Sequence, residues 1–182
     1  MDLNDCIKNR RSVRDYSDKP VEVEKVEKIL NAGAMAPSAM NLQPWRFTVV
    51  ESKSKIRELS DRVKKNLGLL GRGLELAELI KAKEDTIFYG APLLIFVSAG
   101  KTSKWAKIDC GLAAQNMILK AYELGLGSCF IGFACSLNND KEVLKDLAIP
   151  DDHEIIAPLI FGYPRQWPKP KERKPKILKR VN

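Results

Sequence analysis

Segment 108–124 limits the possible folds of this chain more than any other stretch. Its spacing predicts a helix, yet apolar side chains lie on nearly every side of it. The polar side chains within it are Asp109, Gln115, Asn116, Lys120 and Glu123. A monomer of 182 residues can rarely bury every side of a helix. We therefore expect this helix to be central and to lie at a subunit interface.

Composition places the chain among globular proteins, with 45% hydrophobic and 30% charged residues. No stretch reaches the roughly 18 consecutive apolar residues that a membrane span needs. Met1 to Asp5 lacks the basic start and apolar run of a signal peptide. The sequence predicts a cytoplasmic protein that makes no use of a membrane.

The net charge of +8 is concentrated at the C-terminus. From Tyr163 onward eight residues are basic and one, Glu172, is acidic, so this part carries +7 and the other 162 residues carry +1. Such a tail could follow a polyanion, but no RNA-reading aromatic pattern accompanies it, so nucleic acid is the weaker interpretation. The other interpretation is that one or two of its cations meet a ligand phosphate. We expect a domain at 1–163 and a basic, Pro-rich extension at 164–182 that packs on a dimer.

The cysteines and the single histidine indicate neither a metal site nor a hydrolase. The four cysteines form no C-x-x-C pair, and one histidine, His153, leaves a zinc site without obvious ligands. His153 lies just before an apolar strand and is expected at the surface rather than as a general base. We therefore predict no metal and assign no catalytic side chain.

Basic side chains also gather near the N-terminus. Three arginines and a serine occupy five positions: Arg10, Arg11, Ser12 and Arg14. Guanidinium forks together with a hydroxyl suit a phosphate. The alternative is a solvated turn in which Arg14 pairs with Asp15 or Asp18. This segment favours neither interpretation over the other.

A stiff polar loop follows the first long predicted helix. Pro37 and Pro44 bias the residues before them, such as Gln43, towards extended backbone. The loop carries Ser38, Asn41 and Gln43, and a stiff loop with polar groups loses little entropy when it binds a ligand. The alternative is a plain connection whose Ser and Asn cap the chain, which the loop by itself favours.

Periodicity and capping signals predict the other elements. Helices are expected at 2–9, from Ser17 or Asp18 with Pro20 in the first turn, across 53–83 with a break near Gly68, Gly71 and Gly73, and from Asn138 or Asn139 to Leu147. Strands are expected at 45–51, 92–99, 128–133 and 153–163, with a last short one at 176–181. Phe88 and Tyr89 lie in a loop that either borders a pocket or packs on the core.

Four motifs in this order resemble the FMN-dependent nitroreductase family. They are R-R-S-V-R-D-Y at 10–16, A-P-S-A-M-N-L-Q-P-W at 36–45, the helix from D-C-G at 109–111 to L-G-L-G-S-C at 124–129, and G-Y-P at 162–164 with R-K-P at 173–175. Each motif is weak, but four in sequence over essentially the whole chain are specific.

The resemblance implies a fold and a cofactor. The fold is α+β: a nitroreductase-like sandwich with a mostly antiparallel central sheet flanked by helices, assembled as an intertwined homodimer with FMN at the interface. It implies that Arg10, Ser12 and Arg173 or Lys174 hold the FMN phosphate, with Arg11 and Arg14 nearby. The loop residues Pro37, Ser38, Asn41 and Gln43 would reach the cofactor of the other subunit. The backbone at Ile131 and Gly132 would face the flavin ring, with an amide donating to N5.

The resemblance also implies an activity: NADH or NADPH reduces the flavin, and a nitroaromatic, quinone or similar small acceptor reoxidises it in a ping-pong cycle through N5. Ala39 and Met40 depart from the small hydroxyl residues that many relatives carry there. Two alternatives stay open, namely a non-catalytic flavin-binding protein and a polyanion or nucleic-acid binder that uses the basic tail.

Overall fold

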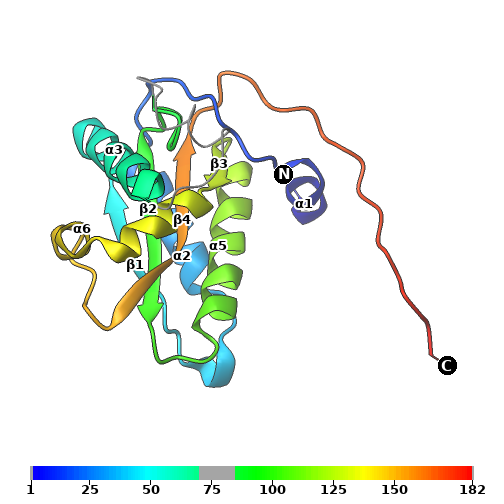
Figure 1. Ribbon diagram of the computed structural model, residues 1–182. Helices are drawn as coiled ribbons and strands as arrows, with labels where there is room; N and C mark the ends of the chain where they lie inside the picture. Colours follow the sequence, from blue (N-terminus) through cyan, green and yellow to red (C-terminus); the bar gives the residue numbers. More distant parts are fainter. Residues whose placement is uncertain (1, 70–84, 182) are drawn as a thin grey trace.

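A four-stranded antiparallel sheet forms the centre of the computed structural model, which describes residues 2–69 and 85–181 (Figure 1). The strands are β1 (Arg46–Val50), β2 (Leu93–Gly100), β3 (Gly127–Phe130) and β4 (His153–Gly162). They are arranged in the order β1-β2-β4-β3, and each neighbouring pair is antiparallel. The predicted α+β class and antiparallel sheet are confirmed.

Helices cover both faces of this sheet (Figure 1). On one face pack α2 (Val23–Ala34) and α5 (Ala106–Glu123), and on the other α3 (Lys53–Leu69), the 3-10 segment η2 (Gly132–Asn139) and α6 (Lys141–Asp146). The short helix α1 (Leu3–Asn9) lies beside α5, away from the sheet. No helix among the described residues is long and apolar enough to cross a membrane.

Strand β2 explains the continuous apolar run in its sequence. Leu93, Ile95 and Val97 join the core under α2 and α5. Leu94 and Phe96 join the core under α3. A strand that is buried on both faces needs apolar residues at every position, which accounts for the continuous run.

Helix α5 is central, but only part of its surface is covered. Ala113, Met117 and Ala121 are fully buried against the sheet and α2. Ile108 and Leu112 are 56% and 41% exposed on the other side of the helix. Exposed apolar side chains that gather on one side of a helix are typical of a surface that contacts another molecule.

Residues 10–17 cross the end of the sheet beside β3. Ser12 forms a parallel bridge with Ser128, and the Val13 amide donates to the Ser128 carbonyl at 3.0 Å. Farther along, the Ser17 amide donates to the Tyr163 carbonyl at 2.8 Å. These bonds place the predicted basic segment directly on the sheet.

Two glycines make this close approach possible. A Cβ atom on Gly127 would lie 2.7 Å from a methyl carbon of Val13, and one on Gly162 would lie 2.9 Å from the Tyr16 ring. Both distances are shorter than real Cβ contacts, so a side chain at either position would push the segment off the sheet.

The predicted start of the second helix is wrong. Helix α2 begins after Glu22, and neither Ser17 nor Asp18 caps it. The Ser17 amide already donates to the carbonyl of Tyr163, just after β4, and the Asp18 carboxylate accepts from Lys53 Nζ at 3.0 Å. These partners keep the segment extended, so Pro20 precedes the helix instead of lying in its first turn.

Two other predicted boundaries are wrong. Asp140 caps α6 by accepting from the Val143 amide at 3.3 Å, where an asparagine was expected. Asn138 instead exchanges two hydrogen bonds with the backbone of Ile155, at 2.9 and 2.7 Å. The third strand ends at Phe130 because η2 begins two residues later.

Helix α3 continues through Gly68, where a break was predicted, and Gly71 and Gly73 lie outside the described residues.

The tail leaves the body after β4 and runs past α1 (Figure 1). Trp167 anchors it by an edge-to-face contact with Tyr122 on α5, with 4.9 Å between ring centroids. Residues 165–181 are exposed and hold no helix or strand, so the strand expected at 176–181 is not formed in this chain.

Candidate functional site

A basic cluster forms where the N-terminal segment meets the tail. Burial, and then the charges of Arg173 and Arg11, lower the pKa of Arg10. Residues from opposite ends of the chain therefore lie within electrostatic reach of each other, as the prediction of a shared phosphate site requires. The Nε atom of Arg10 is buried and has no hydrogen-bond partner among residues 2–69 and 85–181. An anion would satisfy this donor and relieve the crowded positive charge.

The acids beside this segment are engaged elsewhere. Asp15 and Asp18 lie 3.5 and 3.6 Å from the guanidinium of Arg165. Arg14 makes no ion pair with either acid in the described part of the chain; its guanidinium lies over the Tyr89 ring, 5.9 Å from the centroid. The alternative of a turn neutralised by Asp15 or Asp18 is therefore wrong for Arg14.

Three side chains of the basic segment, Arg10, Ser12 and Arg14, act on the buried thiol of Cys129. Burial raises the pKa of the Cys129 thiol, whereas Arg14, the Ser12 hydroxyl and Arg10 act in the opposite direction. Cys129 lies in β3, so all three side chains are within electrostatic reach of the same strand. The fold therefore places Arg10, Ser12 and Arg14 at the same end of the sheet.

Arg11 and Lys174 contribute less directly. Arg11 Nη1 donates to the carbonyls of Lys8 and Arg10, at 2.8 and 2.5 Å, and so closes the C-terminal end of α1. Lys174 is exposed and pairs with Glu172 at 3.1 Å. Of the two cations that the sequence offered from the tail, Arg173 is the one that acts on Arg10.

The polar loop is folded by its own side chains. Ser38 Oγ accepts from the Gln43 amide at 2.9 Å, and Gln43 Nε2 donates to Asn41 Oδ1 at 2.9 Å. Met40, Asn41 and Gln43 have φ values of 49°, 54° and 47°, in the left-handed region. The extended backbone expected at Gln43 is therefore wrong, because the turn that these hydrogen bonds close requires the left-handed conformation. For Met40 and Gln43 this costs about 1 kcal/mol each.

Several polar atoms of the loop have no partner among residues 2–69 and 85–181 after these bonds are made. Because Ser38 Oγ accepts, its hydroxyl proton can still be donated; the Asn41 NH2 group and Gln43 Oε1 are also available. The loop thus offers two donors and an acceptor on an exposed, strained turn. Ser38 does not cap the 3-10 turn with its side chain; its hydroxyl closes the loop onto Gln43, which leaves the loop able to bind a ligand.

A cavity of about 230 Å³ lies where β3 passes into η2. Its lining is aromatic and basic: Arg14, Ile87, Tyr89, Phe130, Ile131, Gly132 and Phe133. The Ile131 amide already donates to the Pro158 carbonyl at 2.9 Å. Of the two backbone amides predicted to face a ring, that of Gly132 is therefore the one left to bind a ligand.

Asp85, which the sequence did not single out, does not line this cavity but holds the turn that carries its lining residues Ile87 and Tyr89. Its carboxylate accepts from the amides of Ile87, Phe88 and Gly90, at 3.2, 2.8 and 3.1 Å, and from the Ser60 hydroxyl at 2.7 Å. The clamp holds Tyr89 at a φ of 56°, an uncommon conformation for a bulky residue. An acidic residue five positions before a glycine was the available signal, and it is weak.

Comparison with known proteins assigns the family. Residues 7–163 match the sequence model of the Nitroreductase family. The chain belongs to the nitroreductase family. A solved nitroreductase with bound FMN from Bacteroides fragilis shares 33% identity and a TM-score of 0.85, over 100% of this chain and 98% of that one. The predicted family and fold are both confirmed.

Other relatives of this nitroreductase-family chain carry different names. An iodotyrosine deiodinase of Thermotoga neapolitana is 31% identical over 99% of this chain and 97% of its own length. An FMN reductase (NADPH) of Bacillus subtilis is 26% identical, over 94% of this chain and 70% of its own length. The predicted class is confirmed: the chain is an oxidoreductase of nitroreductase type. The names of these two relatives refer to different compounds.

Proposed function

We propose that this chain is an FMN-dependent NAD(P)H oxidoreductase that reduces a small acceptor such as a nitroaromatic or a quinone. The observation that carries the proposal is the Nε of Arg10, which is buried without a hydrogen-bond partner among the described residues and lies within electrostatic reach of Arg173. Arg14, in the same segment, lines an aromatic cavity. FMN combines a phosphate with a planar ring, which suits a basic cluster next to such a cavity. The Bacteroides fragilis relative was solved with FMN.

The described residues fit this cofactor. Arg10, Ser12 and Arg173 would bind the phosphate, while Arg11 and Lys174 shape and neutralise its surroundings. Arg14 and the Gly132 amide lie beside the cavity and would meet the ring there, the amide donating at N5.

The loop after Pro37 is complementary to one edge of the ring. The pyrimidine edge of a flavin presents two carbonyl acceptors and one N–H donor. Ser38 and Asn41 can donate to the carbonyls, and Gln43 Oε1 can accept from the N–H. Three complementary groups on one stiff loop favour the flavin over a ligand with a phosphate alone.

Bound in this way, FMN would supply the redox chemistry, namely hydride transfer between NADH or NADPH and the acceptor in a ping-pong cycle through N5. The chain binds the phosphate, orients the ring and leaves one face open. Phe130 and Phe133, 45% and 48% exposed, offer flat apolar surface to whichever substrate occupies the cavity. Proximity and orientation are thus the contribution of the protein, with no acid or base side chain assigned.

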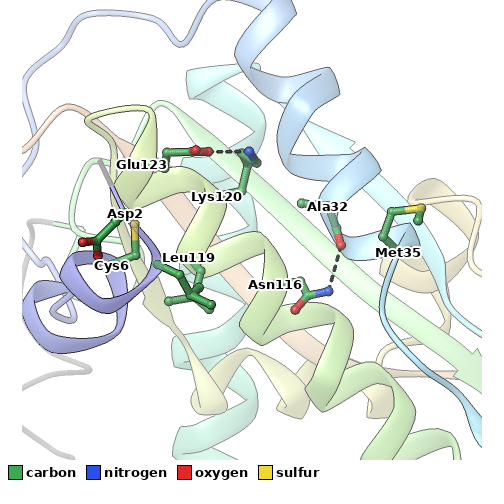
Figure 2. A pocket seen from close by; sticks show the side chains of 9 residues that line it. Asp2, Cys6, Ala32, Met35, Asn116, Leu119, Lys120 and Glu123 are labelled. Carbon is green, nitrogen blue, oxygen red and sulfur yellow. Dashed lines mark hydrogen bonds and ion pairs between the residues drawn. The ribbon is translucent and has the colours of Figure 1, made fainter.

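We infer a homodimer, because apolar side chains are exposed over one side of the molecule. Leu3, Ile7, Met35, Ile108 and Leu112 are each more than 40% exposed on α1, α5 and the end of α2. The groove between these helices has a volume of about 320 Å³, and Leu119 and Met35 line it (Figure 2). A second copy would cover this surface.

A second copy would also complete the site. The loop residues Ser38, Asn41 and Gln43 are absent from the lining of the cavity in one chain. Their role in flavin binding therefore requires that they reach the cofactor of the partner. The exposed extension 164–182 would pack on the partner too, since residues 165–181 are exposed in this chain.

The cytoplasm is the compartment that we propose. Cys6, Cys110, Cys129 and Cys135 are free thiols. Unpaired cysteines are typical of a reducing compartment, where NADH and NADPH are also available.

The visible spectrum of the purified protein tests the proposal. We expect a yellow protein, or one that turns yellow with added FMN, whose flavin is bleached anaerobically by NADH or NADPH and restored by nitrobenzene or a quinone. A protein that stays colourless with FMN would contradict cofactor binding. A flavin that neither nucleotide bleaches would contradict the reductase and favour a non-catalytic flavin protein.

A further inference from the structure

Asp109 is a buried acidic residue with an incomplete set of partners. It lies in the first turn of α5 and is only 3% exposed. Its Oδ1 atom accepts from the Ala39 amide at 3.2 Å. Its Oδ2 atom is buried and has no hydrogen-bond partner among the described residues. A buried polar atom in this state destabilises a fold, so the residue needs an explanation beyond packing.

The Asp109 bond joins the strained loop to the helix layer. The bonds among Ser38, Asn41 and Gln43 are internal to the loop and do not fix where it lies. Met40, which adopts positive φ, is 86% exposed, so its side chain does not fix the loop by burial. The Ala39 amide, in the middle of this turn, is held by a side chain that α5 makes rigid.

We propose that Asp109 is a positioning residue that fixes the loop of Ser38, Asn41 and Gln43 for flavin binding. The inference rests on the proposed function, because the loop is taken to bind FMN. A preformed loop has already lost its conformational freedom, so binding costs less entropy. Asp109 supplies a rigid acceptor at this point, and its unpaired oxygen lowers the stability of the fold. Such a loss of stability is typical of residues that serve function.

Three substitutions test the hydrogen bond from both of its ends. Asp109→Ala removes the acceptor, and Asp109→Asn keeps an oxygen that can accept from Ala39. Ala39→Pro removes the donor; it suits the backbone, because Ser38 is extended and position 39 begins a 3-10 turn. Asp61→Ala, in an exposed pair with Arg57 on α3, is the matched control.

Two quantities would be measured: hydrogen exchange of the 36–45 peptide in the flavin-free protein, and the Kd for FMN. We expect Asp109→Ala and Ala39→Pro each to speed the loop exchange and to raise the Kd about tenfold or more. The double variant should lose no more than either single variant, because both remove the same bond. Asp109→Asn and the Asp61 control should stay within about threefold of the unsubstituted protein.

The melting temperature separates this role from a structural one. Asp109→Ala loses the hydrogen bond to Ala39 but also removes a buried unpaired oxygen, so the melting temperature of the flavin-free variant should change little while it loses FMN affinity. Unchanged exchange and Kd in both Asp109→Ala and Ala39→Pro would overturn the inference. Equal loss of FMN affinity in Asp109→Asn with normal loop exchange would also overturn it, because the carboxylate would then act on the ligand itself.

Failure of the proposed function has a different signature. If the unsubstituted protein binds no FMN, the cofactor assignment fails, whereas exchange of the 36–45 peptide still reports whether Asp109 holds the loop. If the protein binds FMN and the variants bind it equally well, the cofactor assignment stands and the positioning role fails.

Discussion

Arg10, at the proposed phosphate site, lowers the stability of the protein when no ligand is bound. Arg10 is partly buried next to two other guanidinium groups, and one of its donors has no partner among the described residues. Such an arrangement is unfavourable until an anion binds.

Arg10→Ala tests this arrangement at the residue scale. We expect the Kd for FMN to rise about 10- to 100-fold, because a charge-assisted contact with the phosphate is lost. The flavin-free protein should stay folded, with a melting temperature no lower than before, since an uncompensated charge is removed. Isothermal titration or flavin fluorescence measures the affinity, and Arg57→Ala on the exposed side of α3 is the control. An unchanged Kd would remove Arg10 from the phosphate site.

Cys110 gives a prediction about pH. Burial, and then the nearby charge of Asp109, raise the pKa of this thiol from 9.0 to about 12. Between these values the folded protein keeps a proton that the unfolded chain has lost, so stability is present below pH 9 and falls as the pH rises towards 12. The melting temperature should therefore fall over this range, and less steeply in Cys110→Ala. Burial also raises the pKa of Tyr16, so the melting temperature of Cys110→Ala should still fall somewhat with pH. Identical slopes in both proteins would contradict the prediction.

At the scale of elements, the sheet presents the site and short hydrogen-bonded turns shape it. The basic segment lies on β3 and β4 because Gly127 and Gly162 leave room for it. The turn at 85–90 owes its shape to one carboxylate that accepts four hydrogen bonds. Loss of such a side chain leaves several donors unpaired at once.

Asp85→Ala is the corresponding prediction. We expect it to lower the free energy of unfolding by about 3 kcal/mol, since three amides and a hydroxyl lose their acceptor. Urea unfolding measures this loss. Asp61→Ala should change stability by less than about 0.5 kcal/mol. Equal effects of the two substitutions would show that the clamp contributes little.

For the whole molecule, the proposed dimer explains why apolar side chains of α5 are exposed. It also explains why the loop residues Ser38, Asn41 and Gln43 do not line the cavity of their own chain. Leu112 lies on that open side and is 41% exposed. Burying a charge there against a second copy would be costly.

Leu112→Glu should therefore convert a dimer into a monomer and abolish FMN binding, as measured by sedimentation and by flavin absorbance. Leu69→Glu is the matched control, because Leu69 is 79% exposed at the end of α3, on the other face of the sheet. A native protein that sediments as a monomer, or a Leu112→Glu variant that stays dimeric with FMN, would contradict the assembly.

Local patterns were sufficient for much of the structure. Alternation, apolar runs and turn residues predicted β2, β4, α1 and α5 to within a few residues, because these elements depend on the burial of their own side chains. The order of four motifs indicated the family, and the family model confirms it.

Long-range contacts decided the rest. Helix α2 begins later than predicted because Ser17 and Asp18 form hydrogen bonds with residues far away in the sequence. The left-handed turn at Gln43 and the clamp by Asp85 likewise depend on hydrogen bonds that no periodicity encodes. Residue types and their order therefore determined which elements form, whereas the three-dimensional packing decided which side chains meet. That is why Arg10 and Arg173 could be predicted as candidates from sequence, but Asp109 could be recognised only in the folded chain.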